Sequence, residues 1–385
     1  MMRSDMNSYM PVRIFTGEGC IRKNEAEFWR YGKRALIVTG RSSAKACGAL
    51  DDVTYVLDKN DISYVVFDEI SQNPLLIDCM RAGELAAEEN CSFIIGIGGG
   101  SPLDAAKCIS VLAANPGMTR EELYSLKWPA RPLPVIAVGT TAGTGSEVTK
   151  VAVITVPEGR KKSFHHEDIF PAAAFGDPVY TRSLSPEFTA STGIDALAHA
   201  TESYFSRNAN EISRCYSVRA IRLLLPALRL ISLKMKSGRY TPAEKGEGGF
   251  LESDDRETLY NGSIYGGLAI NITGTCLPHT MGYLLTERHG IPHGFACAVF
   301  LPAFLEINRK EVPEIYEAFF EATGITPQEF GKMITELIAG VKPEAFDGEI
   351  EQEHSRWINN SSIMKGWGNI LPETCDEILR EVLNR

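Results

Sequence analysis

The chain has 385 residues, more than a single hydrophobic core usually holds, so two domains are expected. Its 44% hydrophobic and 23% charged residues are typical of a globular protein. Acidic residues outnumber basic ones by 49 to 39, and the net charge of −10 argues against nucleic acid or an anionic membrane as a partner.

Membrane and disulfide patterns are missing from the sequence. No apolar run is long enough to cross a bilayer, and the polar first ten residues lack the core of a signal peptide, so we expect a cytoplasmic protein. The nine cysteines are scattered and never form a CxxC pair. This spacing favours neither a disulfide framework nor a thiolate zinc site.

Short apolar runs alternate with helical patterns in the first half of the chain. The runs lie at 35–39, 64–67, 93–97, 135–138 and 151–156, and several are rich in β-branched residues. Such an alternation predicts βαβ units and a parallel sheet covered on both faces. Residues 1–184 are therefore predicted to form an α/β domain.

The second half has a different periodicity. After Pro186 apolar residues recur every three or four positions, and no convincing strand appears. Residues 185–385 are therefore predicted to form an all-helical domain. A Gly- and Glu-rich stretch at 236–255 is expected to be an exposed loop between two of its helices.

Gly98, Gly99, Gly100 and Ser101 directly follow the strand expected at 93–97. Glycines at a strand-to-helix turn let backbone N–H groups come close to an anion, and the helix N-terminus adds partial positive charge. Such a turn suits a pyrophosphate. The segment matches neither GxGxxG nor the Walker A pattern. A plain tight turn, with Ser101 or Asp104 capping a helix, therefore stays open as an alternative.

A second loop of small residues follows the strand expected at 135–138. It contains Thr140, Thr141 and Thr144. If both strands are parallel, the two loops lie along the same edge of the sheet, where ligands of such folds bind. Together the loops favour a dinucleotide site over a coincidence of turns.

Three histidines and one carboxylate in the second half suggest a metal site. Asp195 and His199 are four residues apart in a helical pattern, so their side chains emerge on one face. His279 and His293 follow, with a Gly and a Pro breaking the chain just before His293. Such a ligand set suits iron(II), zinc or a similar divalent ion. A surface Asp–His pair is the alternative for the first two residues.

These segments together resemble the iron-containing (group III, iron-activated) alcohol dehydrogenase family. The shared motifs are IGIGGGSPLDAAK at 95–107, TTAGTGSEVT at 140–149, DPxxxxxLxP at 177–186, GIDALAHATESY at 193–204 and HTMGYLLTERHGIPHG at 279–294. The resemblance implies an N-terminal Rossmann-like, parallel-sheet dinucleotide-binding domain and a C-terminal helical metal-binding domain. This is a dehydroquinate synthase-like architecture.

The resemblance also implies a metal-dependent alcohol dehydrogenase or aldehyde reductase that transfers a hydride between NAD(P)(H) and a small alcohol or aldehyde. The implied ligands of iron(II), or alternatively zinc, are Asp195, His199, His279 and His293. The residues implied in cofactor binding are Asn73, Gly98, Gly99, Gly100, Ser101, Asp104, Thr140, Thr141, Thr144 and Lys161 or its neighbour Lys162. We further expect a homodimer or a higher homo-oligomer.

Gly40 bears on the choice of cofactor, because it follows the first predicted strand. Family members that use NAD often carry an Asp here, which accepts hydrogen bonds from the adenosine ribose and repels a 2′-phosphate. Because Arg41 and Ser42 come next and could accept that phosphate, we expect NADP(H) rather than NAD(H). The alternative is a helix start with Ser42 or Ser43 as N-cap and Arg41 in solvent.

Tyr283 marks a departure from the family, many members of which have a histidine four residues after the third ligand. With a reference pKa of about 10, a tyrosine carries protons poorly near neutrality. We therefore expect Tyr283 to shape the substrate pocket, with helix packing as the alternative. His289 either takes part in proton exchange in the same pocket or faces water. The catalytic candidates are thus His279, His293, Tyr283 and His289.

Two other functions remain open from the sequence. A glycerol-dehydrogenase-like or dehydroquinate-synthase-like protein would also use a metal and a nicotinamide nucleotide, but such relatives resemble this chain less around Asp195 and His199. A non-enzymatic nucleotide-binding protein is the third interpretation, and the intact set of four ligands argues against it.

Overall fold

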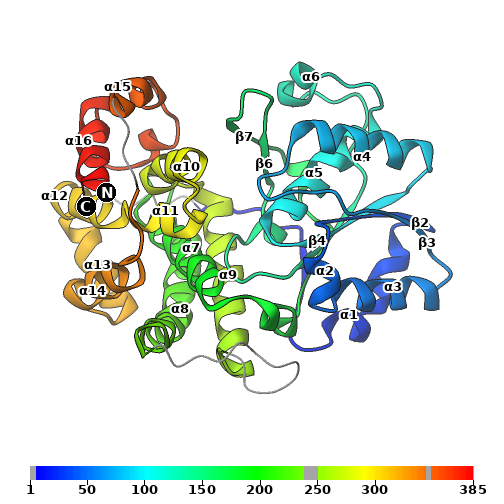
Figure 1. The fold of residues 1–385 in the computed structure, drawn as a ribbon, viewed down its shortest axis with the longest axis horizontal. Coiled ribbons are helices and arrows are strands. Elements are labelled where there is room, and N and C mark those ends of the chain that lie inside the picture. Colours follow the sequence, from blue (N-terminus) through cyan, green and yellow to red (C-terminus); the bar gives the residue numbers. More distant parts are fainter. Residues whose placement is uncertain (1–5, 238–249, 344–347, 385) are drawn as a thin grey trace. The chain divides into compact units, whose positions relative to one another are not determined.

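The computed structural model describes residues 6–237, 250–343 and 348–384 (Figure 1). Most of the loop expected at 236–255 therefore lies outside the described residues. The chain forms two compact units. The α/β unit contains Met10–Leu184 and Leu251–Tyr260, and the helical unit contains the described residues of the remainder.

Six parallel strands form the sheet of the α/β unit, in the order β1-β8-β5-β4-β2-β3. The strands are β1 (Arg13–Thr16), β2 (Arg34–Thr39), β3 (Ser63–Phe67), β4 (Phe93–Gly98), β5 (Val135–Gly139) and β8 (Ala173–Gly176). This confirms the predicted parallel sheet, and four of the predicted apolar runs form β2, β3, β4 and β5.

The fifth predicted run does not join this sheet. It forms β6 (Val151–Thr155), which pairs antiparallel with β7 (Lys161–His165) in a separate two-stranded hairpin. Its buried and half-buried residues alternate, whereas those of β4 and β5 are all buried. The apolar sequence of β6, which is covered on one face, therefore resembles that of central strands covered on both faces.

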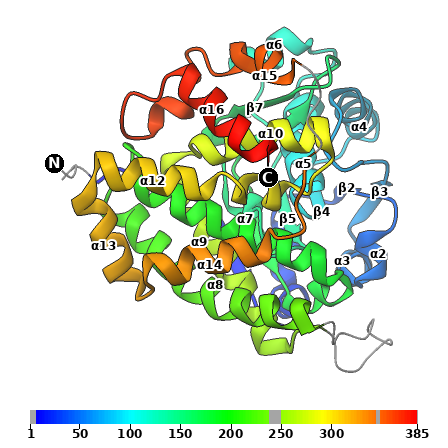
Figure 2. The same cartoon turned by 60° about the vertical axis from the view of Figure 1, so that its left-hand side comes forward.

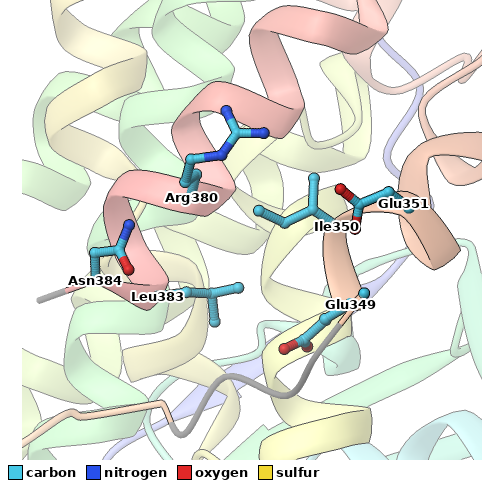
Figure 3. Close-up of a pocket in the computed structure, with 7 residues that line it drawn as sticks. Glu349, Ile350, Glu351, Arg380, Leu383 and Asn384 are labelled. Carbon is cyan, nitrogen blue, oxygen red and sulfur yellow. The ribbon is translucent and has the colours of Figure 1, made fainter.

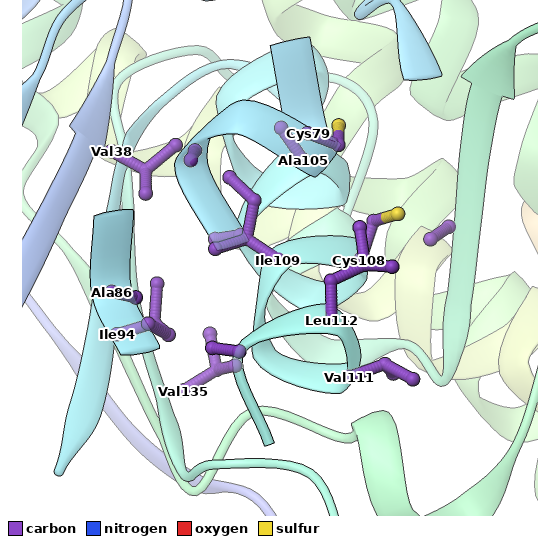
Figure 4. Close-up of a cluster of buried hydrophobic side chains, with 14 of the residues drawn as sticks. Val38, Cys79, Ala86, Ile94, Ala105, Cys108, Ile109, Val111, Leu112 and Val135 are labelled. Carbon is purple, nitrogen blue, oxygen red and sulfur yellow. The ribbon is translucent and has the colours of Figure 1, made fainter. Parts of the chain in front are cut away.

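Alternate residues of the strands face two separate cores. Leu36 and Val38 of β2 pack with helices α4 (Leu76–Glu88) and α5 (Gly100–Ala114), in the core that Figure 4 shows. Ala35 and Ile37 point to the opposite core, which includes residues of α1 (Cys20–Lys23) and α3 (Ala49–Lys59). Helices on both faces explain why the central strands are continuously apolar. The unit also contains two short helices, α2 (Ser43–Ala46) and α6 (Arg120–Ser125).

The order of the strands defines where a ligand of this unit can bind. The chain goes from β2 outward to β3 and then crosses back to β4 on the other side of β2. The carboxyl ends of β2 and β4 therefore flank a topological switch point, the usual ligand position in open α/β sheets. Gly40 follows β2 there, and Gly98 ends β4.

The described residues of the helical unit contain no strand, as predicted. Its helices are α7 (Pro186–Phe205), α8 (Glu211–Ser237), most of α9 (Ser253–Thr273), α10 (Leu277–His289), α11 (His293–Ala298), α12 (Leu301–Glu311), α13 (Pro313–Thr323), α14 (Pro327–Leu337), α15 (Glu349–Glu353) and α16 (Pro372–Leu383). Helices α7 and α8 pack side by side (Figure 2). Among the described residues, no helix is long and apolar enough to span a membrane.

Candidate active site

The two small-residue loops of the α/β unit lie against each other. The backbone N–H of Thr140 donates to the carbonyl of Gly98 over 2.9 Å, where β4 and β5 pair. A Cβ atom on Gly99 would lie 3.0 Å from Thr141 Cγ2, and one on Gly100 would lie 2.9 Å from Thr144 Cγ2. The glycines therefore permit this close approach of the two loops at the first turn of α5.

Asn73 joins this group of residues from a third loop. Its backbone N–H donates to Ser101 Oγ over 3.1 Å, and its own φ of 59° lies in the left-handed region that Asn tolerates. Its carbonyl accepts a hydrogen bond from Thr155 Oγ1, so the loop is also attached to the β6–β7 hairpin, whose first β7 residue is Lys161. Residues that the sequence spreads over 73 to 144 thus meet at one edge of the sheet.

Asp104 has a different set of contacts from those expected of a helix cap. Its Oδ1 accepts from Ser146 Oγ at 2.5 Å and its Oδ2 from the backbone N–H of Val153 at 2.9 Å. Beside it, the fully buried Lys107 donates to Ser146 Oγ and to the carbonyl of Val151. Burial lowers the pKa of Lys107. These polar groups attach α5 to the second loop and to β6, and neither Lys107 nor Ser146 was predicted to have this role.

The segment 40–42 lies at the predicted place but does not distinguish the two interpretations of its sequence. Arg41 and Ser42 are exposed, and α2 begins at Ser43 with Ser42 in the N-cap position. No side-chain hydrogen bond of Ser42 caps the described helix. The cation and hydroxyl expected to accept a 2′-phosphate are thus accessible.

In the helical unit, α7 carries the first two candidate ligands on one face. Ser185 caps this helix by accepting the N–H of Phe188, and Pro186 starts its first turn. Asp195 and His199 follow at four-residue spacing, and both side chains are buried. The surface Asp–His pair considered as an alternative is therefore wrong.

His279 and His293 come from α10 and α11, which pack closely against each other. Gly290 ends α10 in the left-handed conformation, and α11 begins at His293, so the chain reverses where the sequence predicted a break. Gly294 makes this placement possible, because a Cβ there would lie 1.8 Å from the carbonyl oxygen of Ser191 on α7. Glycine thus brings His293 against the Asp195 segment.

The buried atoms of this site fit a divalent cation. Asp195, His279, His293 and Cys297 each offer a ligand atom, and these atoms lie within 4.8 Å of one another. Asp195 Oδ1 and His279 Nε2 are 3.4 Å apart, and among the described residues neither atom has a hydrogen-bond partner. Two tetrahedral ligands at bond lengths of about 2.1 Å from one ion would be separated by about 3.4 Å.

The charges around Asp195 also favour a cation. Burial alone would raise the pKa of its carboxyl, but His199, His279 and His293 together hold the pKa below its ordinary value of 3.8. Burial raises the pKa of the Cys297 thiol to about 11. Asp195 is thus the anionic member of the group.

His199 and Cys297 differ from what the sequence suggested. His199 stacks on His279 with ring centroids 4.4 Å apart, but it is not among the four residues whose ligand atoms come together. Cys297 is in that group, and its Sγ lies 3.7 Å from both ring nitrogens of His293. The sequence signal for Cys297 was its position one helical turn after His293.

Two further candidates, Tyr283 and His289, lie on α10. Tyr283 is half-buried, and its ring stacks on that of His293. The Nε2 atom of His289 lies 2.6 Å from Glu349 Oε1, and both side chains are buried. A cavity near the C-terminus, lined in part by Glu349, Arg380 and Asn384, contains none of the predicted site residues (Figure 3).

Comparisons with known proteins identify the family of this chain. Residues 11–178 match the model of the iron-containing alcohol dehydrogenase family, and residues 189–365 match the C-terminal model of the Fe-containing family. Alcohol dehydrogenase 4 of Saccharomyces cerevisiae is 30% identical over 374 residues, which are 92% of this chain and 93% of that protein. The 1,3-propanediol dehydrogenase of Citrobacter freundii is 33% identical over 76% of this chain and 72% of its own length.

A solved structure is similar over the whole chain. It is that of an iron-containing alcohol dehydrogenase from Thermotoga maritima, with a TM-score of 0.88, 35% identity, and coverage of 99% of this chain and 100% of that one. The fold and the buried ligand group together define a metal-binding oxidoreductase. The chain belongs to the iron-containing alcohol dehydrogenase family.

Proposed function

We propose that this enzyme transfers a hydride between NADP(H) and a small alcohol or aldehyde, with iron(II) or zinc at Asp195, His279 and His293 and with His199 as the fourth ligand. The observation that carries the proposal is the buried pair of atoms Asp195 Oδ1 and His279 Nε2, which face each other without a hydrogen-bond partner among the described residues. Buried polar atoms in such a position need a ligand to satisfy them.

The bound ion would supply Lewis-acid polarisation of a substrate oxygen, and the nicotinamide would supply or accept the hydride. The protein contributes binding and orientation. Asp195 provides negative charge in a site shielded from water, since Asp195 and His279 are only 3% and 2% exposed. Low exposure strengthens electrostatic interactions of the site with developing charge on a substrate.

For the cofactor we propose a site formed by Asn73, the glycines after β4 and the threonines after β5. Its support is the contact between these loops at the carboxyl ends of neighbouring strands. NADP(H) is favoured because Gly40 brings no carboxylate and because Arg41 is exposed beside it. Lys161 belongs to the same proposal. A homodimer or higher homo-oligomer is also proposed, and the mass of the purified protein in solution would test it.

The substrate class rests on similarity to proteins named as alcohol and 1,3-propanediol dehydrogenases. The test is a screen of aldehydes of increasing chain length with NADPH and NADH, on protein of measured metal content. We expect NADPH oxidation with at least one small aldehyde, its loss on chelation, and no turnover by His279→Gln protein. Turnover that persists in chelated, metal-free protein would contradict the proposal.

A further inference from the structure

Glu202 is a fully buried carboxylate that lies next to the proposed metal site but outside the ligand group. It follows His199 by three residues on α7, and its exposed fraction is 0%. One oxygen, Oε1, makes a short contact with His279 Nδ1. The other, Oε2, accepts the backbone N–H of Cys276 over 2.6 Å and lies 3.5 Å from the backbone N of His279.

These contacts place both Glu202 oxygens at the start of α10. Cys276 is the N-cap of this helix, and Pro278 in the first turn has no N–H to offer. The first N–H groups of a helix have no partner inside the helix, and its N-terminus carries partial positive charge. The hydrogen bond that Glu202 accepts from the start of α10 therefore offsets the cost of burying its charge. The same bond fixes the beginning of the helix that carries His279.

The contact with Nδ1 has a chemical consequence for the opposite ring nitrogen. A carboxylate oxygen can only accept, so the proton of a neutral His279 ring belongs on Nδ1 and the lone pair on Nε2. Nε2 is the atom that lies 3.4 Å from Asp195 Oδ1. The ring thus stands between Glu202 and the ligand group, so Glu202 acts through His279 and does not bind the ion itself.

We propose that Glu202 is a positioning residue that holds His279 as its Nδ1–H tautomer, with Nε2 directed at the metal. This inference rests on the metal site of the proposed function and adds to it a residue that sets how tightly the metal is held. Carboxylates that orient a ligating histidine in this way typically change metal affinity by about 10- to 100-fold.

Glu202→Gln tests this role with little change of shape. The backbone N–H of Cys276 can only donate, so the amide oxygen of Gln stays with it and the NH₂ group faces His279 Nδ1. This arrangement moves the ring proton to Nε2, where it blocks the ligand atom. We expect a 10- to 100-fold higher Kd for Zn²⁺, measured by competition with a chromophoric chelator.

Ser203→Ala is the matched control. Ser203 is the next residue of α7, is equally buried, and accepts a hydrogen bond from Thr273 Oγ1 over 3.0 Å. The Ser203→Ala variant therefore loses a buried hydrogen bond that does not involve His279. We expect its Zn²⁺ Kd to stay within about twofold of wild type, while the metal-free proteins melt within a few degrees of one another.

A second measurement needs no variant of Glu202 to fold. In wild-type protein labelled with ¹⁵N-histidine and loaded with Zn²⁺, the His279 signals, assigned from His279→Gln protein, should show a proton on Nδ1. A proton on Nε2, or an unchanged Kd in folded Glu202→Gln protein, overturns the role of Glu202. Equal weakening by Ser203→Ala also overturns it, since general loosening of α7 would then explain the loss.

The proposed metal site can fail separately from this inference. If wild-type protein binds no Zn²⁺, or if His279→Gln binds it as tightly as wild type, the metal site itself is wrong and the role of Glu202 is overturned with it. If wild type binds one equivalent that His279→Gln loses, only the comparison of Glu202→Gln with Ser203→Ala decides the inference.

Discussion

The rings of Tyr283 and His293 stack in parallel, with centroids 5.3 Å apart and planes 6° from parallel. Tyr283 thus lies beside a proposed metal ligand, on a helix whose other face is buried. A phenylalanine would keep this stacking and lose only the hydroxyl.

We therefore predict that Tyr283→Phe changes kcat by less than about tenfold, whereas Tyr283→Ala alters which aldehyde chain length is preferred. The measurement is kcat/KM over a series of aldehydes for both variants. A loss of more than about a hundredfold in Tyr283→Phe would assign a catalytic role to the hydroxyl and contradict the expectation that Tyr283 only shapes the substrate pocket.

His199 and Cys297 are the two candidates for the fourth metal ligand. His199 is an imidazole aligned with His279, and imidazole suits both iron and zinc. We predict that His199→Ala weakens metal binding at least about a hundredfold, and that Cys297→Ser leaves the metal affinity within about threefold, well below the change expected for a lost ligand.

Cobalt gives an independent reading of the same question. We predict that Co²⁺ bound in place of the native ion by three histidines and one carboxylate shows no thiolate-to-cobalt charge-transfer band. Appearance of such a band in wild type, with its loss in Cys297→Ser, would instead make Cys297 the ligand.

Much of the fold could be predicted from the sequence, because central parallel strands are buried on both faces and read as apolar runs. Strand β1 was missed because it has only four residues, and β8 because Ala and Gly dominate its sequence, AAFG. The position of β6 in a hairpin could not be predicted, because its residue types also suit a central strand. The alternation of side chains along a strand does not show which sheet the strand joins.

Three residues of the ligand group, Asp195, His279 and His293, could be proposed from the sequence, because histidines are few in this chain and Asp195 stands at helical spacing from one of them. Glu202 and Lys107 could not, since charged residues in a helical pattern usually face solvent. Only the packing of α10 on α7, and of α5 on β6, buries them. Their roles come from contacts between segments far apart in the chain.

Gly40 provides the test of cofactor preference. We predict a higher kcat/KM with NADPH than with NADH, and that Gly40→Asp moves this ratio at least about tenfold toward NADH by repelling the 2′-phosphate. Gly40→Ala is the control for space, because a Cβ there would lie 3.2 Å from the carbonyl oxygen of Ile70. A wild-type preference for NADH, or equal shifts in the Asp and Ala variants, would contradict this account.

Glu147 should give the α/β unit a measurable pH dependence. Burial raises its pKa above the ordinary 4.5, although Tyr260, whose hydroxyl donates over 2.8 Å, and Lys107 lower it in part. The folded state then binds more protons than the unfolded state between the two pKa values, so Glu147 costs stability as pH rises through that window.

We therefore predict that Glu147→Gln becomes more stable relative to wild type as pH rises from about 4.5, by about 1.4 kcal/mol for each unit of pKa difference. Urea unfolding at several pH values measures this difference. Glu167→Gln, at a side chain that is 63% exposed, is the control for removing a surface carboxylate. A difference for Glu147→Gln that stays constant or shrinks with rising pH would show that the carboxyl is not raised in the folded state.

Hydride transfer is proposed to depend on one divalent ion at Asp195, His279 and His293. Metal-free protein should be titrated anaerobically with iron(II), and in parallel with Zn²⁺, while aldehyde-dependent NADPH oxidation and bound metal are both measured. We predict that activity rises in proportion to bound iron(II), with zinc as the alternative, and reaches its plateau at one equivalent per chain, and that His279→Gln shows neither the binding nor the activity. Full activity before any metal is added, or activity that does not follow occupancy, would contradict the account.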